Sequence, residues 1–198
     1  RDKFIEKKKS SNDELSYLRD LNIRPTIIKL NKSNISRAEQ LNLKTNQFNF
    51  SSKRYNSHEI KIYEKKNFLG LIDLKDDYGE HGLIGMIFLR KVSNILLVDN
   101  FLLSCRILGR RLENWVLNEI IKIMKTQKCD KVFFEFRATE KNHVVKDFIN
   151  ENNFKKIKNY KKIKEFKNIK KTKNIQYLEL NKSKKIKYLE IYGKKKKN

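Results

Sequence analysis

Apolar residues recur along the chain with two different periods, and these periods predict its strands and helices. Short runs rich in β-branched and aromatic residues are typical of strands, whereas apolar positions repeated every three to four residues are typical of amphipathic helices. We expect strands over residues 24–30, 68–74, 83–89, 95–103, 131–136, 175–180 and 187–192. We expect helices over residues 34–43, 112–128 and 142–152, a short one within 1–20, and one over 57–65, where a strand is also tolerated.

Polar segments between these runs predict how the elements connect. Residues 44–55 are dense in amides and hydroxyls and are typical of a loop, and the charged segment 75–82 is typical of the turn of an antiparallel hairpin. A strand meander followed by two crossover helices implies an α/β fold, with a mixed central sheet and helices on both of its faces.

The chain of 198 residues is long enough for one domain with a substantial core. We expect residues 1–22 to be a linker or short helix at the end of an upstream domain, residues 23–192 to form the domain, and residues 193–198 to be a basic disordered tail. No run approaches the roughly 18 apolar residues of a membrane span, no signal peptide opens the chain, and the two cysteines make no disulfide framework. These features predict a cytoplasmic location and no membrane partner.

The net charge of +24 raises the question of nucleic-acid binding, but its distribution argues against a specific reader. From Lys155 onward there are 18 lysines against three glutamates, and asparagine and isoleucine are abundant throughout. A genome rich in A and T produces these residues without selection for any partner. The lysine runs lack the arginine forks and aromatic platforms of nucleic-acid sites, so nucleic acid is not the expected partner.

The most informative segment is a strand that runs into a tight turn and a helix start, over residues 99–113. The turn carries R-x-x-G-x-R, in which Gly109 supplies the turn and Arg106 and Arg110 offer charge-assisted hydrogen bonds. The free N–H groups and the positive dipole end of a helix start suit a phosphate. We therefore predict a phosphate-binding site at Arg106, Gly109, Arg110 and Arg111. The alternative is an ordinary turn with solvated arginines.

Three blocks of sequence together resemble one family. The turn differs from R/Q-x-x-G-x-G/A, the pyrophosphate loop of GNAT-type acyltransferases, at Arg111, where that loop has a small residue. Residues 101–110 (FLLSCRILGR), 44–55 (KTNQFNFSSKRY) and 77–85 (DYGEHGLIG) resemble the C-terminal acyltransferase-like half of the FkbH-like proteins, and the similarity extends over roughly residues 23–154. The resemblance implies a GNAT-like (acyl-CoA N-acyltransferase) fold.

The resemblance also implies an activity. FkbH-like proteins are understood to load a glyceryl-type acyl group onto the phosphopantetheine thiol of an acyl carrier protein, in polyketide or surface-glycan biosynthesis. A HAD-type phosphatase domain precedes the acyltransferase half in that family, and this sequence contains no D-x-D-x-T phosphatase motif. The phosphatase domain is thus expected upstream of Arg1 or is lacking. The implied cofactor is coenzyme A or the phosphopantetheine arm, with no metal, and the basic surface suits an acidic carrier protein.

Several polar residues are candidates for the chemistry. Cys105 lies at the strand end beside Arg106 and is a candidate nucleophile, although a free cysteine is usually a small buried apolar residue. Asp99 is a candidate base, or a residue that orients an arginine. In the 44–55 segment the candidate substrate-binding residues are Asn46, Gln47, Asn49 and Arg54, and turn chemistry is the alternative for the asparagines.

The last predicted helix adds one candidate and one absence. Asn142 begins this helix, where GNAT proteins use an asparagine near the cofactor arm and where asparagine is also a good N-cap. Further along, GNAT enzymes often carry a tyrosine that protonates the departing thiolate, but this chain has Asp147-Phe148-Ile149. The missing acid argues against a plain N-acetyltransferase. Two alternatives stay open, namely a GNAT N-acyltransferase that uses acyl-CoA on an amino sugar, and a non-catalytic GNAT-like module that binds anions or nucleic acid.

Overall fold

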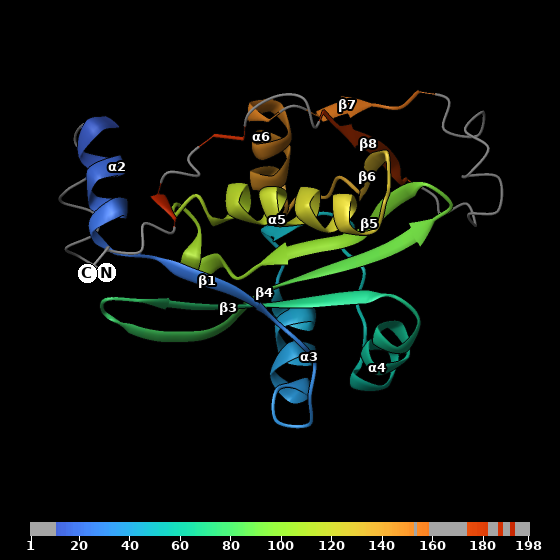
Figure 1. Cartoon of the computed structure of the whole chain (residues 1–198), viewed down its shortest axis with the longest axis horizontal. Helices are drawn as coiled ribbons and strands as arrows, with labels where there is room; N and C mark the ends of the chain where they lie inside the picture. Colours follow the sequence, from blue (N-terminus) through green and yellow to red (C-terminus); the bar gives the residue numbers. More distant parts are fainter. Residues whose placement is uncertain (1–10, 153, 159–173, 182–185, 188–190, 193–198) are drawn as a thin grey trace.

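The computed structural model describes residues 11–152, 154–158, 174–181, 186–187 and 191–192. Its centre is an eight-stranded sheet in which seven strands follow the order β1-β3-β4-β5-β6-β8-β7, while β2 pairs with β5 beside that path (Figure 1). The strands are β1 (Arg24–Ile28), β2 (Phe48–Asn49), β3 (Phe68–Asp76), β4 (Gly79–Val92), β5 (Ile95–Leu103), β6 (Lys131–Phe136), β7 (Phe154–Lys156) and β8 (Gln176–Leu180). The helices are α2 (Ser11–Asp20), α3 (Ile35–Lys44), α4 (Ser57–Lys66), α5 (Leu112–Thr126) and α6 (His143–Glu151).

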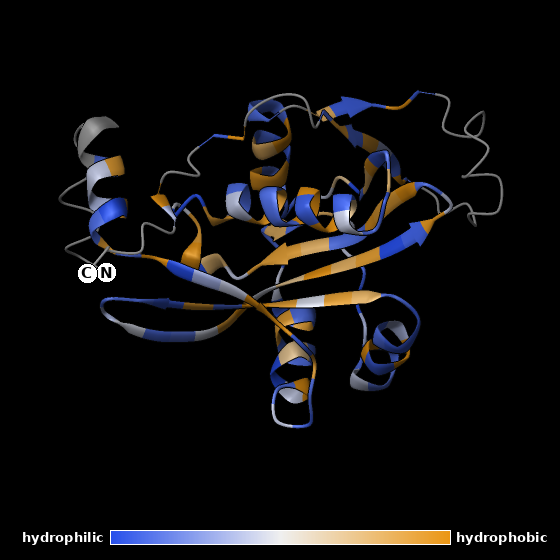
Figure 2. Ribbon diagram, in the orientation of Figure 1, coloured by the Kyte–Doolittle hydropathy of each residue, from blue (hydrophilic) through white to orange (hydrophobic). Residues whose placement is uncertain are grey.

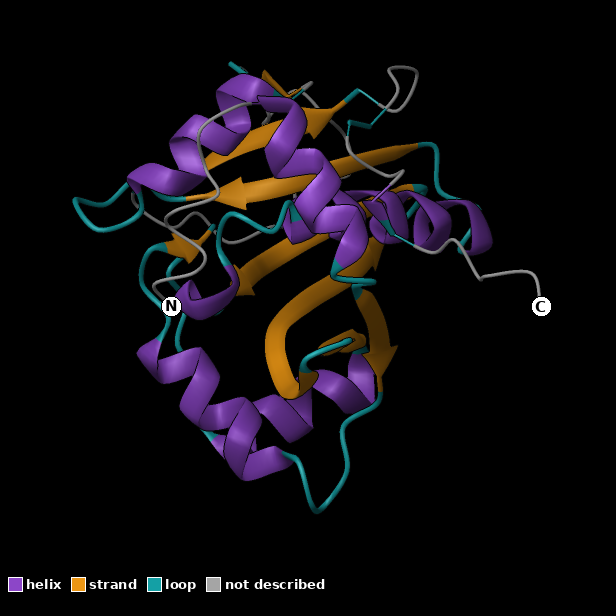
Figure 3. Cartoon of the chain, turned by 90° about the vertical axis from the view of Figure 1, so that its left-hand side faces the viewer, coloured by secondary structure: helices purple, strands orange, loops and turns teal. Residues whose placement is uncertain are grey.

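Helices cover both faces of the sheet, as the sequence predicts. Figure 1 shows α5 and α6 above the sheet and α3 and α4 below it, and Figure 3 shows the same layers from the side. The core on the α5 and α6 face is the larger one and also takes in Leu18 of α2, whereas the core under α3 and α4 is smaller. Figure 2 shows the apolar residues concentrated in the strands and on the sheet-facing sides of the helices. The mixed α/β fold is therefore confirmed.

Strand β5 lies in the middle of the sheet, and all nine of its residues are buried. Residues 95–98 pair in parallel with residues 131–134 of β6, and the other edge of β5 pairs antiparallel with β4. Opposite β4 the register shifts between Phe88 and Leu89, so Asp99 is an extra residue in β5. This bulge places an acidic side chain inside an otherwise apolar strand.

Beyond residue 98 the pairing of β5 with β6 ends, and a segment from much earlier in the chain lies between them. Strand β2 pairs antiparallel with the end of β5. The Phe50 N–H donates to the Phe101 oxygen at 3.0 Å, and the Arg137 N–H, directly after β6, donates to the Phe50 oxygen at 2.9 Å. Residues 48–50 thus fill the opening between the two parallel strands.

Phenylalanine side chains anchor this inserted segment on the α5 and α6 face. The ring centroid of Phe48 lies 5.0 Å from that of Phe101 and 5.5 Å from that of Phe148. The ring of Phe50 lies 5.6 Å from Phe101 and 5.3 Å from Phe134. The two contacts of Phe48 are edge-to-face, an arrangement that aromatic pairs prefer. Aromatic packing therefore holds the segment in place together with its hydrogen bonds.

The structure corrects the sequence expectations at four places. The 44–55 segment is not all loop, because it contains β2. The hairpin turn is shorter than expected, since β3 and β4 extend into the charged segment and leave Asp77 and Tyr78 between them. Strand β7 was not expected. Lys187, Ile191 and Tyr192 belong to no strand, and the rest of residues 187–192 lies outside the described residues, as do 1–10 and 193–198.

Candidate functional site

A cluster of buried charged side chains lies on the α3 and α4 face, where β5 and β6 stop pairing. Asp99, 3% exposed, accepts hydrogen bonds from Arg90 Nη2 at 2.8 Å, from Arg90 Nε at 3.0 Å and from the Tyr63 hydroxyl at 2.7 Å. The hydrogen bonds with Asp99 raise the pKa of Arg90, and burial, followed by the charge of Asp99, raises the pKa of Tyr63. Asp99 thus has a fixed set of three donor atoms from Arg90 and Tyr63.

The second acid of the cluster is Glu135 on β6, a residue that the sequence reading missed. It is 3% exposed and forms an ion pair with the ammonium of Lys53, whose side chain is 29% exposed and so reaches solvent. Burial raises the pKa of Glu135 although the charge of Lys53 lowers it. Burial, together with the charges of Asp99 and Glu135, raises the pKa of Tyr55 as well. A carboxyl with a raised pKa next to a cation is suited to accept a proton near neutral pH.

The segment between α3 and α4 is held largely by its own side chains. Asn49 Nδ2 donates to the Thr45 oxygen at 3.1 Å, and its Oδ1 accepts from the Ser52 N–H at 2.9 Å. Arg54 donates to the oxygen of Asn42 and to Oδ1 of Asn46, both at 2.5 Å. The side chains of Asn46, Asn49 and Arg54 thus take part in hydrogen bonds within this segment and to the end of α3.

Gln47, the remaining candidate of this segment, is exposed. Two polar atoms nearby are buried without a partner in the described part of the chain, namely Oγ of Ser51 and Nδ2 of Asn100. The Ser51 N–H donates to Asn100 Oδ1 at 3.1 Å. These two side chains flank the inserted segment at its junction with β5, beside Asp99.

Asn142 links the start of α6 to the inserted segment. Its Nδ2 donates to the Asn49 oxygen at 3.0 Å and to the Arg137 oxygen at 2.9 Å, and its Oδ1 accepts from the Thr139 N–H at 2.8 Å. Asn142 is the N-cap residue of α6, but its side chain makes no capping bond with that helix. Phe148 lies in the stretch where GNAT enzymes often carry a tyrosine, and it is buried among other phenylalanines.

The loop between β5 and α5 is tied to the β3–β4 hairpin by the arginines expected to bind phosphate. Arg106 Nη2 donates to the oxygens of His81 and Leu83 at 2.7 and 3.1 Å. Arg110 Nη1 donates to Asp76 Oδ2 at 2.6 Å. Burial lowers the pKa of Arg106. Both guanidinium groups thus already have acceptors within the chain.

The start of α5 combines features for and against an anion. Gly109 has φ +87°, and Arg111, the N-cap, has φ +58°, a left-handed conformation that a small residue adopts more easily. The guanidinium of Arg111 extends to 3.8 Å from both Glu14 of α2 and Glu151 of α6. In the first turn, burial raises the pKa of Glu113, whose Oε2 has no hydrogen-bond partner in the described part of the chain. The N–H groups favour a phosphate here, and the Glu113 carboxylate opposes it.

The two cysteines lie in different environments. Cys105 is exposed and begins a single 3₁₀ turn (Cys105–Ile107) after β5, which excludes the buried alternative for this residue. Cys129 is buried, and burial raises the pKa of its thiol. Cys105 is thus accessible to solvent, whereas Cys129 is not.

Four members of the charged cluster were missed from the sequence: Arg90, Lys53, Tyr63 and Glu135. Glu135 alone had a usable signal, because it is a single charge inside the apolar run 132–136. The others come from separate segments, and the fold is needed to bring them together. Within the described ranges, no helix is long and apolar enough to cross a bilayer, and no group of three or more His, Cys, Asp or Glu side chains is placed to hold a metal ion.

Comparison with known proteins gives a fold. No family model and no curated protein sequence matches the chain. Solved structures do match, among them a GNAT-family acetyltransferase from Staphylococcus aureus (15% identity, TM-score 0.58, 79% of this chain and 98% of that one). A second is the ribosomal-protein-S18-alanine N-acetyltransferase of Escherichia coli (11% identity, TM-score 0.53, 79% of this chain and 92% of that one). A third is Rv2747 of Mycobacterium tuberculosis in complex with CoA (10% identity, TM-score 0.57, 78% of this chain and 98% of that one). The chain therefore has the GNAT acetyltransferase fold.

Proposed function

We propose that this domain is an acyltransferase that moves a glyceryl-type acyl group onto the phosphopantetheine thiol of an acidic acyl carrier protein. The observation that carries the proposal is the Glu135–Lys53 ion pair, buried beside Asp99 at the point where β5 and β6 stop pairing. A thiol has a pKa near 8.5 and needs a base to attack an acyl carbon at neutral pH. Glu135, with its raised pKa, is suited to be that base.

The roles of the residues in the transfer follow from their charges. Glu135 accepts the thiol proton as the sulfur–carbon bond to the acyl group forms. Lys53 stabilises the negative charge that develops on the carbonyl oxygen. Glu135 then returns the proton to the leaving group as its bond to the acyl carbon breaks. Arg90 and Tyr63 hold the Asp99 charge in place, and Asp99 in turn disfavours a second negative charge on Glu135, which helps to raise its pKa.

The phosphate-bearing part of coenzyme A or of the carrier's arm is proposed to bind at the start of α5. The backbone N–H groups of this helix end and the charges of Arg106 and Arg110 fit an anion, whereas the Glu113 carboxyl and the pairing of Arg110 with Asp76 oppose it. Rv2747, which shares the fold, was solved with CoA, and this supports the assignment of such a cofactor. The net charge of +24 supports an acidic protein partner, which it would steer toward the domain.

N-acyltransfer from acyl-CoA to an amino sugar is the second candidate. It is favoured by the fold, because the E. coli structure that matches is an N-acetyltransferase. It is opposed by Phe148, which supplies no proton where a tyrosine acid was sought. The two reactions differ in the acceptor, and the acceptor can be tested directly.

The test is a transfer assay read by mass spectrometry. The full chain is incubated with a glyceryl thioester and a phosphopantetheinylated acyl carrier protein, and we expect the carrier to gain the acyl mass. Glu135→Gln should lower the rate by about 10²–10⁴-fold, the usual contribution of a positioned base. Glu179→Gln is the matched control, because Glu179 is also paired with a lysine, Lys131, at 3.4 Å, but lies outside the cluster.

Each other outcome has a definite meaning. Acetylation of an amino sugar from acetyl-CoA without carrier loading would replace the proposal by the second candidate. Carrier loading at the wild-type rate by the Glu135→Gln protein would remove Glu135 from the mechanism. Salt-sensitive binding of anions or DNA with neither transfer activity would indicate a non-catalytic module. A HAD-type phosphatase encoded in frame upstream would support the FkbH-like assignment.

A further inference from the structure

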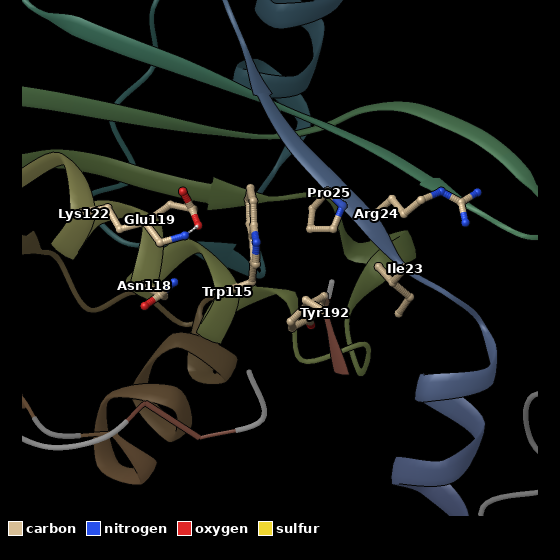
Figure 4. A pocket seen from close by; sticks show the side chains of 8 residues that line it. All are labelled: Ile23, Arg24, Pro25, Trp115, Asn118, Glu119, Lys122 and Tyr192. Carbon is tan, nitrogen blue, oxygen red and sulfur yellow. Dashed lines mark hydrogen bonds and ion pairs between the residues drawn. The ribbon is translucent and has the colours of Figure 1, made fainter. Parts of the chain in front are cut away.

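A pocket of about 390 Å³ lies between the first residues of β1 and the outer side of α5. Figure 4 shows Trp115 standing in its middle, with Pro25 and Tyr192 on one side and Glu119 and Lys122 on the other. Asn118 lies below them on the same helix. The four α5 residues share one face of the helix, because their spacing is three, four and seven. The volume falls within the range of small-molecule sites.

The apolar walls of this pocket are fixed. Trp115 and Tyr192 are partly buried and pack against the larger core. The Tyr192 hydroxyl donates to the Arg110 oxygen at 2.6 Å, which holds the ring at the rim of the pocket. Two flat rings and a proline, at a fixed position, form walls that can contact the face of another ring.

The charged groups around the pocket are already neutralised. Lys122 donates to Glu119 at 2.7 Å, and Arg24 donates to Asp77 at 2.8 Å. In the described part of the chain, the Asn118 amide and the Trp115 indole N–H make no hydrogen bond, and both are uncharged. The groups free to recognise a ligand are therefore neutral donors and an amide oxygen.

We propose that this pocket binds a neutral pyranose ring. A pyranose has apolar C–H faces, which suit Trp115 and Tyr192, and a rim of hydroxyls, which suit the Asn118 amide and the indole N–H. A nucleotide would need an unpaired cation for its phosphate, and a polyamine would need an unpaired carboxylate, and the two ion pairs leave neither. The pocket lies on the α5 face of the sheet, opposite Glu135, so this site does not rest on the acyltransferase proposal.

The chain has a single tryptophan, Trp115, so its intrinsic fluorescence reports on this pocket alone. The full chain is titrated with glucose, galactose, mannose and N-acetylglucosamine, and with AMP and spermidine as charged comparisons. We expect a saturable fluorescence change with at least one neutral sugar at millimolar concentration and a matching rise in Tm. Asn118→Ala should weaken this binding about fivefold, the value of one hydrogen bond.

The matched control is Lys125→Ala, an exposed residue in the last turn of the same helix and outside the pocket. It keeps Trp115 and should bind the sugar as the wild type does. Saturation by AMP or spermidine and not by a sugar would overturn the proposal. Unchanged fluorescence and unchanged Tm with every sugar would also overturn it, as would equal binding by the Asn118→Ala and Lys125→Ala proteins.

Discussion

Arg110 donates a hydrogen bond from Nη1 to Oδ2 of Asp76 at 2.6 Å, although the two residues are 34 positions apart. The same carboxylate accepts from His81 at 2.7 Å and from the Tyr78 N–H at 2.9 Å, and its side chain is fully buried. The β3–β4 hairpin and the loop that begins α5 are thus held together by one acidic residue. The phosphate-loop candidate Arg110 depends on the hairpin for its position.

We expect Asp76→Asn to destabilise the fold by about 3 kcal/mol, because it leaves a half-buried Arg110 without its charge partner. Burial raises the pKa of Asp76, but the hydrogen bonds from His81, Tyr78 and Arg110 outweigh it and the net pKa is lowered. A lowered folded pKa means that this stability is present above the unfolded value near 4 and is lost as the pH falls through the folded pKa. Urea unfolding between pH 3 and pH 7, with about one pH unit between points, measures it.

The control for this variant is Asp77→Asn. Asp77 pairs with Arg24, but both side chains are about half exposed, so the change should cost less than about 1 kcal/mol. Equal losses for the two variants would show that Asp76 has no special role in joining hairpin and loop.

Asn142→Ala should lower the free energy of unfolding by about 2–4 kcal/mol. The Asn142 side chain is fully buried, and its removal leaves the Asn49 oxygen, the Arg137 oxygen and the Thr139 N–H without a hydrogen bond. Asn152→Ala, which removes a single bond to the Phe148 oxygen, should cost about 1 kcal/mol or less. Chemical denaturation of both proteins gives the comparison. A stable Asn142→Ala protein that fails to bind coenzyme A would instead favour the cofactor role expected from the sequence.

The two thiols should react at very different rates with a thiol-specific reagent. Cys105 is exposed, whereas Cys129 is buried and burial raises the pKa of its thiol. One equivalent of the reagent should therefore react quickly with the native protein, and a second should react only after unfolding. Cys105→Ala should remove the fast phase and leave Tm unchanged. If that variant also keeps full transfer activity, Cys105 is not a nucleophile. Loss of the fast phase in Cys129→Ala instead would contradict the burial of Cys129.

Glu113→Gln should bind coenzyme A about tenfold more tightly than the wild type above neutral pH, because it removes a negative charge from the start of α5. Burial raises the Glu113 pKa, so the carboxyl gains its proton as the pH falls and wild-type binding should then approach that of the variant. Calorimetric titrations at two pH values measure this difference. The control is Glu64→Gln, a change at an exposed residue of α4. Equal affinities of Glu113→Gln and the wild type for coenzyme A at high pH would place the anion elsewhere.

The fold was predictable from the sequence where one face or both faces of an element are apolar over several residues. Strand β5 and helix α5 satisfy this condition, and both were predicted within a few residues. Strand β2 was not predicted, because it has two residues in a segment rich in amides, and its pairing depends on β5, more than 50 residues later. The β3–β4 hairpin was predicted, but the predicted strands ended where charged residues begin, whereas the observed strands continue through them.

The candidate site was predictable only in part, for a related reason. Asp99 was found because it stands beside a recognisable motif, and the geometry assigns it Arg90 as partner. Lys53 and Glu135 are 82 residues apart, and nothing in either local sequence indicates the other. Asn46 and Arg54 carry hydrogen-bonding groups suited to a substrate, but the chain itself uses those groups, and composition does not distinguish the two uses.

The insertion of residues 48–50 between β5 and β6 has a consequence for the order of folding. The opening that receives this segment exists once β5 and β6 have both formed, and β6 ends at Phe136. During synthesis the segment must therefore wait for about ninety further residues before its hydrogen bonds and aromatic contacts can form. Contacts between such distant parts of a chain slow folding, because the loop between them must close first. The centre of the sheet is thus expected to become native late, after the β3–β4 hairpin.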